Sequence, residues 1–250
     1  MSNGRRAYGL GAIAMGAAFA VFHALAMARR GAAPAPSVSV HDALAFLGAA
    51  ILIAGGVLLN LRRTSSVGAA ALAAYFGLSV LTQGIPPLIS GPMVMVNWQN
   101  LAEFAAMTAG GVAAYALAPD VSAARSARLA RGAVLAFGLC LLVFGASHFV
   151  YAQLTASLVP AWLPPDQMVW TYLTGVAQIA ACAALLSGIQ ARLAALMLAA
   201  MYVAFALLVH TPLILGAPAL RGNWDELCET LVLAGAAWAM ADAAERRARR

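Results

Sequence analysis

Charged residues are scarce in this 250-residue chain: 10% of its residues are Asp, Glu, Lys or Arg, and all fifteen basic residues are Arg. An ordinary soluble domain carries about 25% charged residues. The chain therefore lacks the side chains that would cover a water-facing surface, and lipid is its expected solvent. We interpret the net charge of +6 as a sign of membrane topology and of contact with anionic lipids, and not of nucleic-acid binding.

Cysteine is scarce as well. Cys140, Cys182 and Cys228 are isolated from one another, and the sequence contains no C-x-x-C motif. A dithiol redox site or a zinc site needs paired cysteines or a Cys/His cluster. We therefore expect no metal site and no thiol chemistry by the protein itself.

Long apolar segments fill the rest of the chain, which is 63% hydrophobic with a mean hydropathy of +0.85. A bilayer core about 30 Å thick is crossed by roughly 20 apolar residues of helix. Continuous apolar segments of this length argue against the strands of a β-barrel, in which apolar and polar residues alternate over about ten residues. We predict an all-α membrane protein with eight transmembrane helices, at residues 8–28, 42–61, 67–89, 98–118, 132–153, 168–188, 192–214 and 224–243.

The arginines predict the orientation of these helices. With the N-terminus inside, all but three of them fall on the cytoplasmic side, and the exceptions are Arg29, Arg30 and Arg221. The positive-inside rule then predicts that both termini are cytoplasmic. Because Arg29 and Arg30 directly follow the first segment, we expect that segment to be a retained helix and not a cleaved signal.

The chain contains an internal repeat at an offset of 126 residues. Asn97-Trp98-x-x-Leu101-x-Glu103 recurs as Asn223-Trp224-x-x-Leu227-x-Glu229, and Pro86 and Pro92 recur as Pro212 and Pro218. Such residues are rare in this composition, so their agreement in order and spacing is informative. Because each unit holds an even number of helices, we predict two parallel four-helix repeats: 1–118, a cytoplasmic linker at 119–131, and 132–250.

Polar side chains inside the helices gather toward the predicted outer face. Ionisable groups are costly in lipid, so such positions indicate function. We predict an outward-opening polar pocket, roofed by loops that contain Pro and Trp. The candidate pocket residues are His23, Gln83, Glu103, His148, Tyr151, His210 and Glu229, and the loop or interface residues are Asn97, Trp98, Pro160, Trp162, Asn223 and Trp224.

Each of these residues also has a structural interpretation. The tryptophans suit aromatic anchors at the membrane interface, and Asn97 and Asn223 suit helix N-caps. The two glutamates could be protonated or hydrogen-bonded to a neighbouring helix. His23 and His148 would lie at equal depth, the minimum geometry for bis-histidine haem ligation. A repeat places any two equivalent residues at equal depth, so we do not expect haem.

The second half, from about residue 144 to 243, resembles the DoxX family of small four-helix membrane proteins. The resemblance rests on GASHF at 145–149, VPAWLP at 159–164, YLTG at 172–175 and His210-Thr211-Pro212. It implies a four-helix unit in a bacterial cytoplasmic membrane and a link to sulfur, quinone or thiol redox processes. The first half matches only through the internal repeat, which implies a double-length relative. This chain has no cysteine pair, so it does not fit the thiol chemistry that the resemblance implies.

Three functions remain open, and the sequence does not decide whether the protein is an enzyme. The first is a redox-associated protein that binds a quinone between its helices, with His148, Tyr151 and Glu229 exchanging protons or hydrogen bonds with the ring. The second is an accessory or assembly subunit that docks a membrane-protein partner. The third is a protein that binds or transports a lipid-like or small organic solute.

Overall fold

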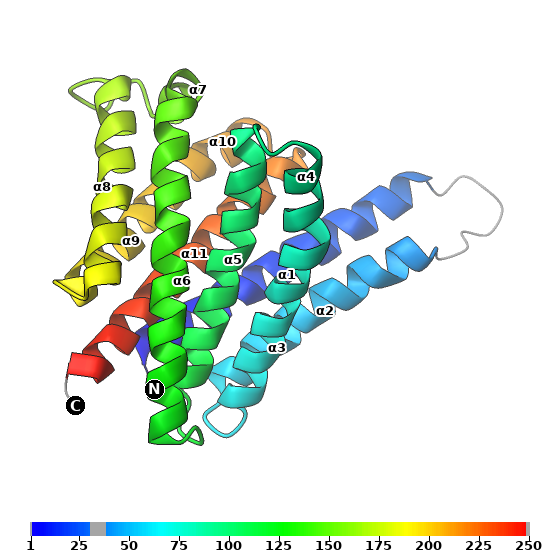
Figure 1. Cartoon of the computed structure of the whole chain (residues 1–250). Helices are drawn as coiled ribbons and strands as arrows, with labels where there is room; N and C mark the ends of the chain where they lie inside the picture. Colours follow the sequence, from blue (N-terminus) through cyan, green and yellow to red (C-terminus); the bar gives the residue numbers. More distant parts are fainter. Residues whose placement is uncertain (1, 31–38, 249–250) are drawn as a thin grey trace.

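The computed structural model describes residues 2–30 and 39–248, and within these ranges every regular element is helical (Figure 1). The helices run up and down through the molecule and are joined mostly by short turns. In chain order they are α1 (Asn3–Arg30), α2 (Val40–Asn60), α3 (Ser65–Ser79), η1 (Val80–Gly84), α4 (Ile85–Ser90), α5 (Met95–Ala116), α6 (Ala123–Val150), α7 (Ala152–Leu158), α8 (Gln167–Ser187), α9 (Ala191–Phe205), η2 (Ala206–His210), α10 (Thr211–Gly216) and α11 (Arg221–Ala248).

The predicted all-α class is confirmed. In the part of the chain that the structure describes, seven helical stretches are long and apolar enough to cross a membrane, as expected of a multi-pass membrane protein. α5 is a 22-residue helix that corresponds to the predicted segment 98–118, but it is not among the seven. Its first turns carry Asn97, Gln99, Asn100 and Glu103, which lower its hydropathy. The number of eight spans stays a prediction.

The predicted linker at 119–131 is mostly helical. α6 begins at Ala123, so Arg125, Arg128 and Arg131 lie on its first turns, and only residues 117–122 join it to α5. Ala and Arg are among the best helix formers, and arginines at a helix end can reach water. A membrane-spanning helix can therefore continue past the apolar segment from which its boundary was predicted.

Two long helices contain a π-helical turn at equivalent places. η1 continues α3 into α4, and η2 continues α9 into α10. Pro86 and Pro212 are each the second residue after the π turn. A proline ring clashes with the carbonyl four residues earlier and supplies no N–H, so the helix must widen or break there. These prolines alter the helix geometry without ending it at once.

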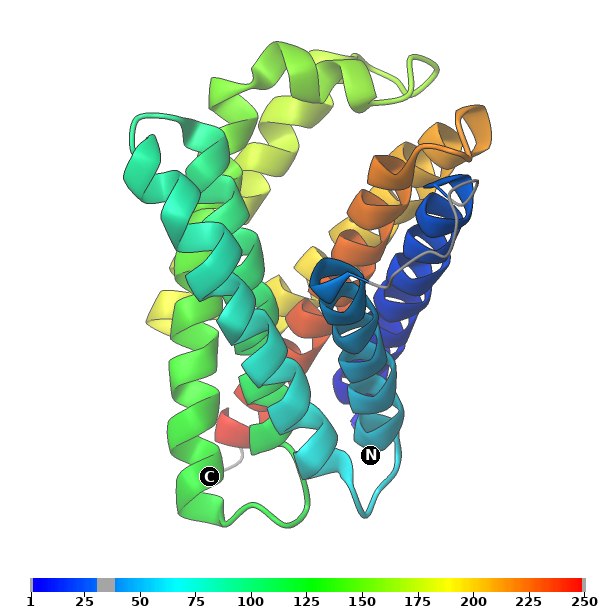
Figure 2. The ribbon, with the colours of Figure 1, turned by 90° about the vertical axis from the view of Figure 1, so that its right-hand side faces the viewer.

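The main helices pack in a closed order: α1 against α2, α2 against α3, α3 against α5, α5 against α6, α6 against α8, α8 against α9, α9 against α11, and α11 against α1. α5 and α11 also pack against each other across the middle. In Figure 2 the α1–α2 hairpin lies on the opposite side of the molecule from α6 and α8. α5 and α11 are therefore the central helices, and they are the two that carry Glu103 and Glu229.

Small residues permit this central packing. A Cβ added to Gly235 of α11 would lie 2.4 Å from the backbone N and Cα of Tyr8 on α1. Tyr8 is fully buried, and its hydroxyl donates to the carbonyl of Met107 on α5 at 2.6 Å. Helices in lipid associate through close backbone packing of this kind, because burying apolar side chains there contributes little free energy to association. α1, α5 and α11 thus form the core beneath the polar residues.

Candidate functional site

Glu103 and Glu229 come together where α5 and α11 pack. Both are partly buried, and Glu229 interacts electrostatically with the carboxyls of Glu103, Glu226 and Asp225. Oε1 of Glu103 accepts a hydrogen bond from Nε2 of Gln99, one turn earlier, at 3.1 Å. Two neighbouring carboxyls in a low-dielectric setting repel each other when both are ionised.

Tyr202 of α9 adds a hydroxyl to this cluster. Its side chain is 4% exposed and interacts electrostatically with Glu103. Its hydroxyl has no hydrogen-bond partner among the residues that the structure describes. A buried hydroxyl without a partner costs free energy, so this one is available to a ligand or to water.

His148 of α6 contacts Phe205, which also contacts Tyr202. Its ring stacks on Phe205 with centroids 6.4 Å apart, and Phe205 meets the edge of the Tyr202 ring at 6.2 Å. Nδ1 of His148 donates to the carbonyl of Phe144 at 2.8 Å, which leaves Nε2 as an acceptor when the ring is neutral. His148 is therefore connected to Tyr202 through the Phe205 ring, and Tyr202 in turn interacts electrostatically with Glu103.

His210, in η2, is joined to α11. Its Nε2 lies 3.0 Å from Oγ1 of Thr230, the residue after Glu229, and its buried Nδ1 has no partner among the described residues. The π turn thus directs a second polar ring toward the segment of α11 that carries the carboxyl.

Gln83 and Tyr151 take other roles. The Gln83 side chain is exposed, and its backbone carbonyl accepts from Nδ2 of Asn100 at 2.9 Å. The Tyr151 hydroxyl accepts from the backbone N–H of Val96 at 3.1 Å. The backbone carbonyl of Gln83 and the side chain of Tyr151 thus bind the first turns of α5 to its neighbours, and neither side chain is shown in contact with the carboxyl cluster.

His23 lies at a separate place, between α1 and α2. Its Nε2 is 2.9 Å from Oδ1 of Asp42, and its ring contacts His41 and Phe46, all on α2. The contacts of His148 are on α6 and α9. The structure therefore does not bring the two histidines to one site, and a haem held between them has no geometric support.

Three tryptophans near the helix ends each form the same kind of hydrogen bond, from the indole N–H to the carbonyl of a proline. The indole N–H of Trp98 donates to the carbonyl of Pro92 at 2.9 Å, and that of Trp224 donates to Pro218 at 3.0 Å. Trp170 donates to Pro164 at 2.9 Å in the same way. A tryptophan that bonds to the proline six residues before it therefore occurs three times, and only two of these pairs belong to the internal repeat.

Asn97 and Asn223 are not N-caps. Nδ2 of Asn97 donates to the carbonyls of Pro87 and Gly91 at 3.0 and 2.9 Å, and Nδ2 of Asn223 donates to Leu213 and Ala217 at 2.9 and 3.4 Å. These carbonyls belong to the ends of α4 and α10, where a helix leaves acceptors unsatisfied. The asparagines therefore close the preceding helix instead of starting their own.

The loop after α7 projects outward. Trp162 is 71% exposed, and the carbonyl of Pro160 accepts from the N–H of Leu163 at 3.0 Å in a turn. The side chain of Gln167 donates to the carbonyl of Val159 and ties the loop to α8. An exposed tryptophan here suits a membrane-interface contact better than a roof over the carboxyls.

The sequence interpretation missed four polar residues of this region. Gln99 and Glu226 lie one turn before Glu103 and Glu229, a spacing that could have identified them. Thr230 gave no signal, because a lone Thr hydroxyl in an apolar helix usually bonds to its own backbone. Tyr202 gave none, because a single tyrosine in an apolar helix does not stand out from other core aromatics. Among the described residues, no three His, Cys, Asp or Glu side chains are placed to hold a metal ion.

Comparison with known proteins identifies one region of similarity. Residues 137–211, from the middle of α6 through η2 to the first residue of α10, match the model of a family described as a domain of unknown function, DUF8561. No curated protein and no solved structure matches the chain.

Proposed function

We propose that the chain crosses the membrane eight times as two parallel four-helix repeats, with both termini in the cytoplasm of a bacterium. The packing order supports this, because exchanging α1, α2, α3 and α5 for α6, α8, α9 and α11 leaves every neighbour relation in place. The π turns, the Trp-to-Pro bonds and the Asn-to-carbonyl bonds also recur 126 residues apart. A relation to the DoxX family remains part of this proposal and rests on the sequence motifs alone.

The proposed activity is the binding of a small lipid-soluble molecule with ring oxygens, of which a quinone is the best example, at the cluster of Glu103, Glu229 and Tyr202. The observation that carries this proposal is that Glu103 interacts electrostatically with its repeat counterpart Glu229 and also with Tyr202, whose buried hydroxyl has no partner among the described residues. The hydroxyl can donate a hydrogen bond to one ring carbonyl, and a carboxyl in its protonated form can donate to another.

A binding measurement in lipid nanodiscs tests this activity. We expect a short-chain quinone to bind the wild-type protein and to bind about tenfold more weakly to Tyr202→Phe and to Glu229→Gln, because each removes a buried polar contact. Tyr172→Phe is the matched control, since Tyr172 is an exposed tyrosine that stacks on Phe149. Unchanged binding in both cluster variants would overturn the assignment.

Proton-coupled movement of a small solute is a second candidate. It is favoured by the position of the carboxyl pair at the interface between the two proposed repeats, where a relative shift of α5 and α11 would separate the charges. Solute-driven proton flux in proteoliposomes, abolished by a double Glu103→Gln and Glu229→Gln variant, would favour this function over static binding.

A further inference from the structure

α1 and α11 are close at one end and diverge toward the other. At the inner end, Cβ atoms added to Gly4 or Gly11 would lie 2.4 and 2.9 Å from the backbone of α11. Farther along, Ala14, Ala17 and Ala18 of α1 line an open space beside α11. The divergence leaves a groove of about 760 Å³ between the two helices.

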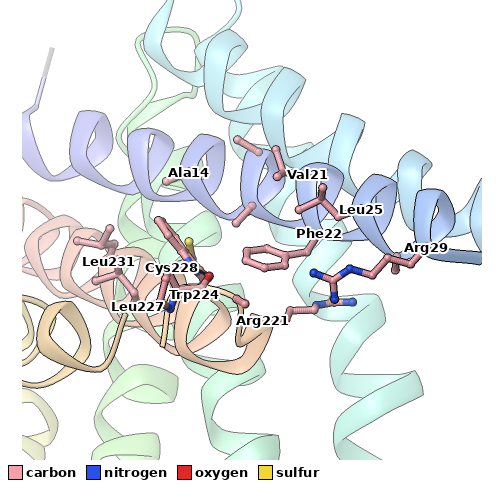
Figure 3. Close-up of a pocket in the computed structure, with 15 residues that line it drawn as sticks. Ala14, Val21, Phe22, Leu25, Arg29, Arg221, Trp224, Leu227, Cys228 and Leu231 are labelled. Carbon is pink, nitrogen blue, oxygen red and sulfur yellow. Dashed lines mark hydrogen bonds between the residues drawn. The ribbon is translucent and has the colours of Figure 1, made fainter. Parts of the chain in front are cut away.

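The walls of this groove are apolar. α1 contributes alanines with Val21, Phe22 and Leu25, and α11 contributes Leu227, Cys228 and Leu231. The ring of Phe22 lies 6.1 Å from that of Trp224, in a tilted contact across the groove (Figure 3). A volume within the usual range for ligand sites, about 300–1,000 Å³, and an apolar wall suit a hydrocarbon chain.

Two arginines stand at the outer end of the groove. Arg29 comes from the last turn of α1 and Arg221 from the first residue of α11, and Figure 3 shows their side chains at the same end, beside Phe22. They are two of only three arginines that the sequence assigns to the outer side of the membrane. Two residues nearly 200 positions apart thus bring like charges to the mouth of one apolar groove.

These charges are only partly balanced. Asp225 lies 3.1 Å from Nε of Arg221, whose guanidinium also lies 5.4 Å from the centroid of the Phe19 ring. Among the described residues, no acidic side chain forms an ion pair with Arg29. Two converging guanidinium groups with one carboxylate leave a net positive site, and a phosphate diester is the anion whose paired oxygens match the guanidinium fork.

We propose that this groove is a binding site for an anionic phospholipid, with the phosphate between Arg29 and Arg221 and one acyl chain along α1 and α11. Phe22 and Trp224 lie at the level where the glycerol backbone would sit, which is where aromatic side chains concentrate in membranes. The site is separate from the carboxyl cluster, because neither Glu103 nor Glu229 lines it.

The purified full-length protein tests the proposal by native mass spectrometry with phosphatidylglycerol and phosphatidylcholine of the same chain lengths. We expect preferential retention of phosphatidylglycerol. Arg29→Gln and Arg221→Gln should each weaken its binding about fivefold, the effect of one arginine near an anionic headgroup. Asp225→Asn should strengthen it, because it removes the competing carboxylate. Arg192→Gln is the charge-matched control. Arg192 is an exposed residue in the first turn of α9, away from the groove, and it pairs with Glu245.

A further variant tests the groove itself. Ala17→Phe should fill the space along α1 and weaken the retention of both lipids while both arginines remain. Equal retention of the two lipids by the wild-type protein would overturn the proposal. So would a loss of phosphatidylglycerol binding in Arg192→Gln as large as in Arg29→Gln, because the effect would then be one of overall charge.

Discussion

Nε2 of His23 on α1 lies 2.9 Å from Oδ1 of Asp42 on α2, and the two side chains are 6% and 5% exposed. The other carboxylate oxygen of Asp42 accepts from the hydroxyl and the backbone N–H of Ser39, at 2.6 and 3.1 Å. Asp42 thereby completes a capping box at the start of α2 and binds α1 at the same time. The carboxylate of Asp42 therefore links α1 to the start of α2.

Replacing His23 with Ala should lower the free energy of unfolding by about 1–3 kcal/mol, because a buried carboxylate loses one of its hydrogen bonds. Thermal unfolding in detergent micelles measures the change. His41→Ala is the control, because His41 is exposed and should alter stability by less than about 0.5 kcal/mol. Equal shifts for the two variants would contradict a special role for the His23–Asp42 contact.

Gly235→Ala should destabilise the protein by about 1–3 kcal/mol, since the added methyl group would meet the backbone of Tyr8 and force α1 and α11 apart. Gly132→Ala provides the comparison. Gly132 is also inside a helix, but a Cβ there has no atom within 4 Å. It should be neutral or stabilising by up to about 1 kcal/mol. Thermal unfolding measures both variants. A larger loss of stability in Gly132→Ala than in Gly235→Ala would show that the close crossing of α1 and α11 does not stabilise the protein.

Asn97→Ala should cost more stability than Asn223→Ala. Asn97 donates to two carbonyls at 2.9 and 3.0 Å, whereas the second bond of Asn223 is longer, at 3.4 Å. We expect a loss of about 1 kcal/mol for Asn97→Ala. Limited proteolysis of the α4–α5 and α10–α11 turns measures local opening directly. Faster cleavage at the second turn in Asn223→Ala than at the first in Asn97→Ala would contradict the expected order.

Arg5→Lys should lower stability by about 1–2 kcal/mol although the charge is kept. Arg5 is 3% exposed, and its Nη1 donates to the hydroxyl of Ser65 and the carbonyl of Leu117, at 3.3 and 3.4 Å. Leu117 directly follows α5 as its C-cap, so a planar cation there also balances the helix dipole. Arg128→Lys, at an exposed position of α6, should have no measurable effect in the same unfolding assay.

The positions of the helices could be predicted from sequence because a bilayer requires a continuous apolar segment, and seven of the predicted segments coincide with membrane-length helices. α5 differs because its first turns carry Asn97, Gln99, Asn100 and Glu103, whose partners lie within the bundle. Hydropathy averages over a segment, so it cannot distinguish polar groups that face neighbouring helices from those that face lipid.

The candidate site was predictable only in part. Glu103 and Glu229 stood out because rare residues recurred at one spacing, but nothing in the sequence indicated that His23 would bind Asp42 instead of facing His148. The choice of partner depends on which helices become neighbours. Arg5 illustrates the same limit: its position suggested a residue at the membrane surface, and the fold buries it against the end of α5.

The pairing of α1 with α11 also constrains biosynthesis. α1 leaves the ribosome some two hundred residues before α11, yet its glycine face at Gly4 and Gly11 fits the backbone of that later helix. During translation this narrow face must remain against lipid or against the insertion machinery. The bundle can therefore close only after α11 has entered the bilayer, and a ribosome stalled before residue 221 would leave the first hairpin without its partner.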